Sequence, residues 1–244
     1  MSDSVLYAEL TPTDFRRRLA AAPIAYLPLG TLEWHGEHMP LGADGLQSQG
    51  FFVKLAEEVG GIVLPMLFVG PDLRVEHEGE VLYGMDTHLD GRDRPGRLDG
   101  SAYWIDGEQF KLLLENILEQ LARAGFRIVV AHGHTPSIQA FDAPRAEWEA
   151  RYGLKLFSCW GSPEDADYGI QTDHGAANET SLTMALRPEL VHLEYLDPDP
   201  SVIPIGIGGL EPRTHASVER GEKILALQVP RMAGILRQAL GELG

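Results

Sequence analysis

The stretch Arg127-Ile128-Val129-Val130-Ala131-His132-Gly133-His134 decides the fold of this chain. Four apolar residues, most of them β-branched, follow the arginine, and such a run predicts a buried β-strand. The strand leads without a break into two histidines separated by a glycine. In open α/β sheets, functional sites form where strands end in this way.

Outward from this strand, the sequence alternates between helical and extended patterns. Apolar residues recur at spacings of three, four and seven between Asp106 and Gly125, which predicts a helix that the glycine ends. Further strands are expected at 24–30, 62–67 and 154–157, and further helices at about 51–59, 137–152 and 180–186. This alternation predicts an α/β fold: a single three-layer αβα domain, residues 1–244, with a mostly parallel sheet between helices.

Two segments fit this pattern less simply. Residues 70–106 are rich in Gly, Asp and Arg and show no sustained period. An irregular stretch of that length in a compact domain is usually functional or disordered. The tail from Ser217 to Leu243 is mostly helical, and Pro230 is expected to break or restart the helix.

Composition narrows the class of function. The 244 residues include 20 basic and 36 acidic side chains, a formal charge of −16, which argues against nucleic acid or an anionic membrane as partner. No apolar run approaches the roughly 20 residues needed to span a bilayer. The amino terminus lacks the pattern of a signal peptide and Cys159 is the only cysteine, so we expect a cytoplasmic protein without an internal disulfide.

The first polar cluster, residues 30–44, directly follows the expected strand at 24–30. Glu33 and His35 are two positions apart, so they point the same way in extended backbone. Asp44 can return across a turn rich in glycine and proline. Carboxylate and imidazole are ligands that suit zinc, manganese or iron. A surface loop with unrelated charges is the other interpretation, and the grouping at a strand end favours the metal site.

A second cluster, residues 132–134, ends the strand with which we began. His134 could complete a metal centre with Glu33 and Asp44. His132 could instead orient a neighbouring group.

The third cluster spans residues 173–181. Asp173 and His174 pair a carboxylate with an imidazole, which suits general acid–base catalysis. Glu179 lies near the start of an expected helix. It could cap that helix or bind a metal, and the sequence leaves both open.

In this order, the three clusters resemble those of the creatininase family. Its members carry a Gly-Ser-Thr-Glu-Gln-His-Gly-Pro-His-like stretch that ends in an aspartate, an Asn-Gly-His stretch after a strand, and an acidic-His-Ala/Gly-Gly-x-x-Glu-Thr-Ser stretch before a helix. Residues 30–44, 132–134 and 173–181 match these stretches, and 186–191 looks like the family's continuation. The resemblance implies a three-layer α/β fold and a homo-oligomer, commonly a hexamer.

The resemblance also implies a role for each metal-binding side chain. Glu33 and His134 would hold one divalent ion and His35 the other, and Asp44 would bridge the two. Glu179 would lie beside the ions. We expect one or two ions per subunit, with zinc first and manganese or iron as alternatives.

By the same resemblance, the ions would activate water to open a small cyclic substrate. His174 would be the proton shuttle, and we expect Asp173 to orient it. A cyclic amide is the first expectation for the substrate, as in creatinine amidohydrolase. The alternatives are a C–C hydrolase that opens a cyclic polyhydroxy ketone such as 3-dehydro-scyllo-inosose, a deformylase of a formamidopyrimidine, and a non-catalytic metal-binding relative.

Several departures from the family pattern bear on the substrate. Thr135 and Pro136 stand where creatininase proper has a tyrosine and a glutamate, so one ligand of the second ion is missing. Ile170 replaces a tryptophan of the creatinine pocket, whereas Trp160 matches another. We expect Trp160, Thr135 and Ile170 to line a pocket with few aromatic walls, in which creatinine is a poor substrate.

Overall fold

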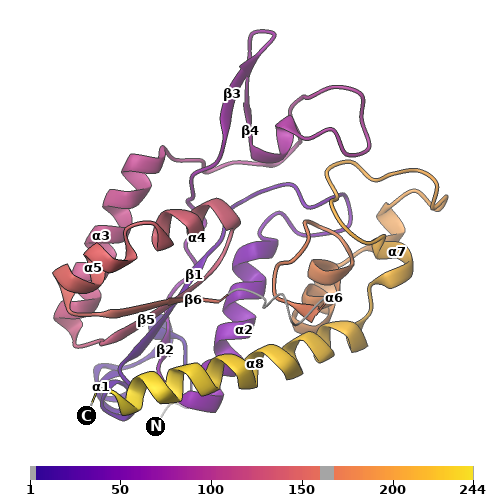
Figure 1. Ribbon diagram of the computed structural model, residues 1–244. Helices are drawn as coiled ribbons and strands as arrows, with labels where there is room; N and C mark the ends of the chain where they lie inside the picture. Colours follow the sequence, from indigo (N-terminus) through magenta and orange to yellow (C-terminus); the bar gives the residue numbers. More distant parts are fainter. Residues whose placement is uncertain (1–3, 160–167, 244) are drawn as a thin grey trace.

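Four parallel strands form the central sheet, in the order β2-β1-β5-β6 (Figure 1). The computed structural model describes residues 4–159 and 168–243. β1 (Ile24–Leu29) and β5 (Ile128–Gly133) occupy the centre and pair along their whole length, and every residue of both is buried. The short strands β2 (Ile62–Val63) and β6 (Lys155–Ser158) form the edges.

Helices cover both faces of the sheet (Figure 1). One layer consists of α2 (Ala43–Val59), α6 (Ala177–Leu186) and α8 (Val218–Gly241). The other consists of α1 (Pro12–Ala21), α3 (Gly107–Ala124), α4 (Thr135–Asp142) and α5 (Arg145–Tyr152). Alternate residues of β1 point to opposite layers, so Tyr26 packs in the first core and Leu27 in the second. The predicted three-layer α/β fold with a mostly parallel sheet is confirmed.

The segment 70–106 contains a β-hairpin that the sequence did not suggest. β3 (Arg74–His77) and β4 (Glu80–Tyr83) pair in antiparallel fashion, project from the sheet body (Figure 1) and lead into a 3₁₀ turn at Gly84–Thr87. Most of the side chains on both strands are exposed or half-buried. Leu82 is the one fully buried side chain of the two strands. The strands therefore lack the sustained alternation of buried apolar residues that reveals a strand in sequence.

Three other differences from expectation occur at prolines. The strand expected at 62–67 ends at Val63, close to Pro65, which has no N–H for the ladder. The helix expected at 137–152 is two helices, α4 and α5, with Pro144 capping the second. Pro230 lies inside α8, which continues through it. Ala226, whose carbonyl loses its partner there, is exposed, so water can satisfy it.

The chain ends in two helices that pack against α6 and α2. α7 (Pro212–His215) leads into α8, which packs along α6. Within the residues that the structure describes, no helix is both long enough and apolar enough to cross a membrane.

Candidate metal centre

The metal-ligand candidates gather at the carboxyl ends of the two central strands. The loop that follows β1 carries Glu33 and His35 and then enters α2, whose first turn holds Asp44. β5 ends at Gly133, with φ +140, and a Cβ there would lie 1.8 Å from the carbonyl oxygen of Leu29. Glycine therefore lets the strands meet closely, and the backbone N–H of His134 donates to that same carbonyl at 2.7 Å. His134 is thus fixed against the loop.

One triad of ligand atoms lies around Nδ1 of His134. This nitrogen is 3.1 Å from Oε2 of Glu33 and 3.4 Å from Oδ2 of Asp44. All three residues are buried, and their ligand atoms lie within 4.8 Å of one another. The arrangement suits a divalent ion held by two carboxylates and an imidazole.

A second triad shares the same aspartate. Nε2 of His35 is 3.3 Å from Oδ1 of Asp44 and 3.7 Å from Oε2 of Glu179. Asp44 therefore turns one carboxylate oxygen toward each triad, the geometry of a bridging ligand. Glu179 projects from the first turn of α6 into this second group instead of being exposed at the helix end.

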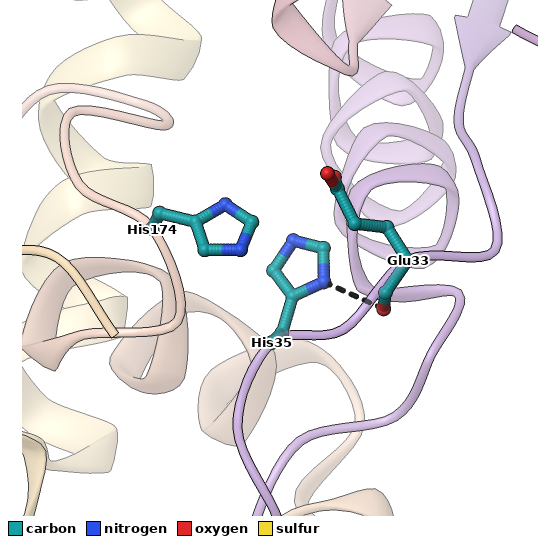
Figure 2. A group of neighbouring side chains, drawn as sticks. All are labelled: Glu33, His35 and His174. Atoms are coloured by element: carbon teal, nitrogen blue, oxygen red, sulfur yellow. Dashed lines mark hydrogen bonds between the residues drawn. The ribbon is translucent and has the colours of Figure 1, made fainter. Parts of the chain in front are cut away.

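The state of His35 fits a metal ligand. Its Nδ1 lies 3.1 Å from the backbone carbonyl of Glu33, which can only accept, so Nδ1 carries the proton (Figure 2). With an ion bound, Nε2 would lose its proton and turn its lone pair to the ion. Nε2 is buried, and within the described part of the chain its polar neighbours are the carboxylates of Asp44 and Glu179. A cation between these groups would take the place of the proton that Nε2 otherwise shares with them.

The charges of the cluster also call for a cation. Burial lowers the pKa of His35, but Asp44, Glu179 and Glu33 outweigh burial and raise it to about 10. Burial raises the pKa of Asp44, yet His35 and His134 hold it well below its usual range. Without an ion, the carboxylates therefore keep protons on the imidazoles, and a divalent ion would replace those protons.

His174 lies against His35 from a separate stretch of chain. The two rings stack with centroids 4.3 Å apart, and Glu33 lies on the far side of His35 (Figure 2). Nε2 of His174 donates to the backbone carbonyl of Trp34 at 2.8 Å, which leaves the lone pair on Nδ1. Burial, together with the charge on His35, lowers the pKa of His174. The ring is therefore neutral near pH 7 and can accept a proton.

Asp173 has a different role from the one expected. Its carboxylate accepts hydrogen bonds from the backbone N–H groups of Asn178 at 2.7 Å and Glu179 at 3.0 Å, and so caps α6. The carbonyl of Trp34, not this carboxylate, orients His174. The expectation that Asp173 orients the imidazole is therefore corrected, because the first turn of α6 engages both carboxylate oxygens.

Two further histidines are structural. Nδ1 of His132 donates to the hydroxyl of Ser48 at 2.8 Å, and that hydroxyl donates to the backbone carbonyl of Asp44 at 2.6 Å. Nε2 of His38 lies 2.9 Å from the hydroxyl of Thr180 and so ties the β1–α2 loop to α6. Burial lowers the pKa of each imidazole to about 4. Both are neutral supports of the centre.

A cavity of about 290 Å³ opens over the centre. Among the residues named from sequence, it is lined by Glu33, Asp44, His134, Thr135, Asp173, His174 and Glu179. Ile170 lies instead in the apolar core, 1% exposed, so the expectation that it lines the pocket is corrected. Trp160, the third expected wall, lies outside the described residues.

Sequence reasoning missed five residues of this cavity, Asp72, Gly84, Met85, His88 and Gln171, and two of them contact the ligand candidates. Asp72 lies 3.3 Å from Nε2 of His134. Gln171 donates to Oδ1 of Asp44 at 2.9 Å from a backbone with φ +50, a conformation that costs energy in a residue other than glycine. No motif marks either residue. The only signal was that Asp72 falls in the long irregular segment and Gln171 just before the third cluster.

Comparison with known proteins gives one consistent result. The family model described as creatininase, creatinine amidohydrolase, matches residues 8–236. The creatinine amidohydrolase of Pseudomonas putida is 30% identical over 273 aligned positions, which cover 98% of each chain. A manganese creatininase superposes with a TM-score of 0.71 at 28% identity, and a mutant creatininase of zinc–zinc type with 0.71 at 27%. Each covers 98% of this chain and 99% of its own.

Proposed function

Because this chain belongs to the creatininase family, we propose that it is a metal-dependent hydrolase that opens a small cyclic amide with water. The observation that carries the proposal is the pair of ligand triads that share Asp44, with His174 stacked beside them. The zinc–zinc and manganese forms among the similar structures support zinc or manganese as the ion.

Glu33, Asp44 and His134 would hold one ion, and His35, Asp44 and Glu179 the other. The second group lacks the family ligand that Pro136 replaces, and Glu179 supplies it with a buried carboxylate. Divalent ions bound in this way lower the pKa of water and polarise a carbonyl oxygen. The remaining chemistry belongs to the side chains.

His174 is the group that moves the proton. Its Nε2–H is held by the carbonyl of Trp34, so Nδ1 is the nitrogen that takes a proton from the attacking water. The same nitrogen returns the proton to the ring nitrogen that departs as the amide C–N bond breaks. Its lowered pKa keeps it in the base form at the start of each cycle. Asp173 contributes by capping α6 and so keeping Glu179 at the centre.

The cavity supports a small substrate that carries no negative charge. Its volume of about 290 Å³ suits a single ring. Among the described residues that line it, none is Lys or Arg, and the sequence of 160–167 contains neither. A phosphorylated, nucleotide-like formamidopyrimidine would therefore find no lysine or arginine among these residues to bind its phosphate. Thr135, at the cavity wall, can exchange hydrogen bonds with ring substituents.

Steady-state kinetics on a panel of substrates tests the proposal. The chelator-treated enzyme would be reloaded with Zn²⁺ or Mn²⁺ and given creatinine, other five- and six-membered cyclic amides, and a cyclic polyhydroxy ketone. We expect a cyclic amide other than creatinine to have the highest kcat/KM. A higher value for the ketone would assign C–C ring opening instead. Bound metal without turnover of any substrate would indicate a non-catalytic relative.

Assembly and location remain predictions from sequence and resemblance. We propose a cytoplasmic homo-oligomer, and light scattering of the purified chain would measure its size.

A further inference from the structure

The segment from Gly70 to Trp104, which the proposed function leaves unused, encloses the outer side of His134. The backbone carbonyl of Pro71 lies 3.3 Å from Nε2 of this histidine. The indole of Trp104 lies 5.9 Å from the imidazole between ring centroids, and Tyr83, at the end of β4, stacks on that indole. The hairpin that projects from the sheet is therefore rooted beside a metal-ligand candidate.

Asp72 is the polar side chain of this segment that reaches His134. Its Oδ2 lies 3.3 Å from Nε2, while its Oδ1 accepts from the backbone N–H of Leu73 at 2.6 Å. The side chain is 11% exposed, so the contact is largely shielded from water. Glu33 and Asp44 approach the opposite nitrogen, Nδ1. Asp72 is thus on the side of the ring away from the ligand triad.

These contacts determine which ring nitrogen of His134 carries the proton. The carbonyl of Pro71 can only accept a hydrogen bond, and so can an ionised Asp72, so Nε2 carries a proton. The lone pair of Nδ1 then faces the position of the first ion. A carboxylate on the second nitrogen of a metal-ligating histidine holds the ring and makes it a stronger ligand.

We propose that Asp72 is a positioning residue, which holds His134 in the orientation that binds the first ion. The proposal rests on the metal centre of the proposed function and extends it to the hairpin segment. Asp72 does not belong to either ligand triad, and it acts through the imidazole that it contacts.

Gly84 shows that the chain is built around this carboxylate. Gly84 follows β4, has φ +47 and donates its N–H to the carbonyl of Leu73 at 3.0 Å. A Cβ at this position would lie 2.3 Å from Oδ2 of Asp72 and 3.2 Å from Oε1 of Glu33. The return of the hairpin therefore packs directly on Asp72, and any larger residue would displace it from His134.

Metal titration of purified, chelator-stripped protein tests the role of Asp72. Zn²⁺ would be added in competition with a chromophoric chelator, so that the affinities of the two positions are resolved. Asp72→Ala should weaken the first position roughly 10–100-fold and leave the second within a few-fold of wild type, the range seen when such outer partners are lost. Asp72→Asn keeps an oxygen that can accept from Nε2–H and should restore most of the loss.

Two control variants are needed. One shows whether the effect of Asp72→Ala comes from lost positioning or only from lost charge, and the other whether the effect of Gly84→Ala comes from displacing Asp72 or only from backbone strain. Glu76→Ala removes a carboxylate from the same hairpin at an exposed site and should leave both affinities unchanged. Gly84→Ala should weaken the first position as Asp72→Ala does. Gly79→Ala, at φ +86 with nothing within 4 Å of its Cβ, bears the same kind of backbone strain and should not.

The outcomes are distinct. Unchanged affinity in Asp72→Ala would overturn the role of Asp72 and leave the metal centre intact. Equal losses in Asp72→Ala and Asp72→Asn, with the stoichiometry reduced by one ion, would make Asp72 a direct ligand. A wild-type protein that binds no divalent ion would overturn the proposed function itself.

Discussion

The candidate metal centre has a strand-borne side and a loop-borne side, and they are constructed differently. The strand-borne side comprises the ends of β1 and β5 and the first turn of α2, which carry Glu33, Asp44 and His134. The loop-borne side is residues 168–179, which reach the centre through turns and the start of α6. The first side continues directly into the buried sheet, whereas the second is held by Ile170 in the apolar core and by individual hydrogen bonds.

Those hydrogen bonds are specific and few. The backbone of His174 exchanges two hydrogen bonds with Gly208, each of 2.9 Å. The N–H of Gly175 donates to Oε2 of Glu179 at 2.8 Å. Because the fold depends less on this side, we infer that the strand-borne side sets metal binding together with stability. The loop-borne side sets proton transfer and the occupancy of the second position.

The largest expected effect comes from the residue that both ions share. Asp44→Ala should lose both ions and reduce activity to the background rate, because each triad loses one of its three ligands. Elemental analysis of the dialysed protein, together with turnover of the best panel substrate, measures this.

The matched control is Asp14→Ala, which removes another buried aspartate from the first turn of a helix, α1. It should cost some stability, through loss of the hydrogen bonds that Asp14 accepts from Thr11 and Arg17, and retain both ions. If Asp44→Ala kept its full metal content, the strand-borne side would not be the site of metal binding.

His174→Ala should isolate the loop-borne side. We expect metal content and fold to be retained, with kcat reduced roughly 10²–10⁴-fold, the usual range for a lost general acid–base. His174→Gln is the companion variant, because its amide nitrogen reaches about as far as Nε2 and can still donate to the carbonyl of Trp34, while it cannot shuttle a proton. Both should be equally slow. Loss of an ion in either variant would make His174 a ligand and remove the distinction between the two sides.

Substitution of one glycine on each side tests whether the strand-borne side contributes more to stability than the loop-borne side. Gly133→Ala forces a Cβ to within 1.8 Å of the backbone of β1, which cannot move without breaking the sheet. We expect it to lower the free energy of unfolding by at least about 3 kcal/mol, as large steric and backbone effects do.

Gly175→Ala is the counterpart on the loop-borne side. Its Cβ would lie 2.7 Å from the carbonyl oxygen of His35, at φ +59. The contact is with a loop and not with the sheet, so we expect the free energy of unfolding to fall by only about 1 kcal/mol, the usual cost of a left-handed non-glycine residue. We nevertheless expect a clear loss of turnover. Urea unfolding of the metal-free proteins gives both values. Equal destabilisation by the two variants would contradict the contrast.

The same contrast explains what could be predicted from sequence. Apolar runs mark β1 and β5, and polar residues that follow them meet at one edge of a parallel sheet, so Glu33, Asp44 and His134 could be brought together in advance. The position of Asp72 could not be predicted, because the segment that brings it to His134 leads into a hairpin without a continuous apolar face. The capping role of Asp173 was equally hidden, since adjacency in sequence suggested a contact that the turn before α6 does not make.

The last effect is on stability in acid, through His132 on the strand-borne side. Burial lowers its pKa in the folded protein to about 4, whereas the unfolded chain has the ordinary value near 6.5. Between these pH values the unfolded state binds the extra proton, so its contribution to stability is lost as pH falls from about 6.5 to 4. This shift in pKa corresponds to a loss of at most about 3 kcal/mol in the free energy of unfolding at the lower pH.

Urea unfolding from pH 7 to 4.5, with the metal removed at every pH, measures the contribution of His132 to stability without interference from metal release. Other groups titrate in the same range, so the informative quantity is the difference between wild type and His132→Asn. Asparagine can still donate to Ser48 but carries no titrating group. We therefore expect its stability to fall less steeply with acid than that of wild type. Parallel curves would mean that the pKa of His132 does not differ between the folded and unfolded states.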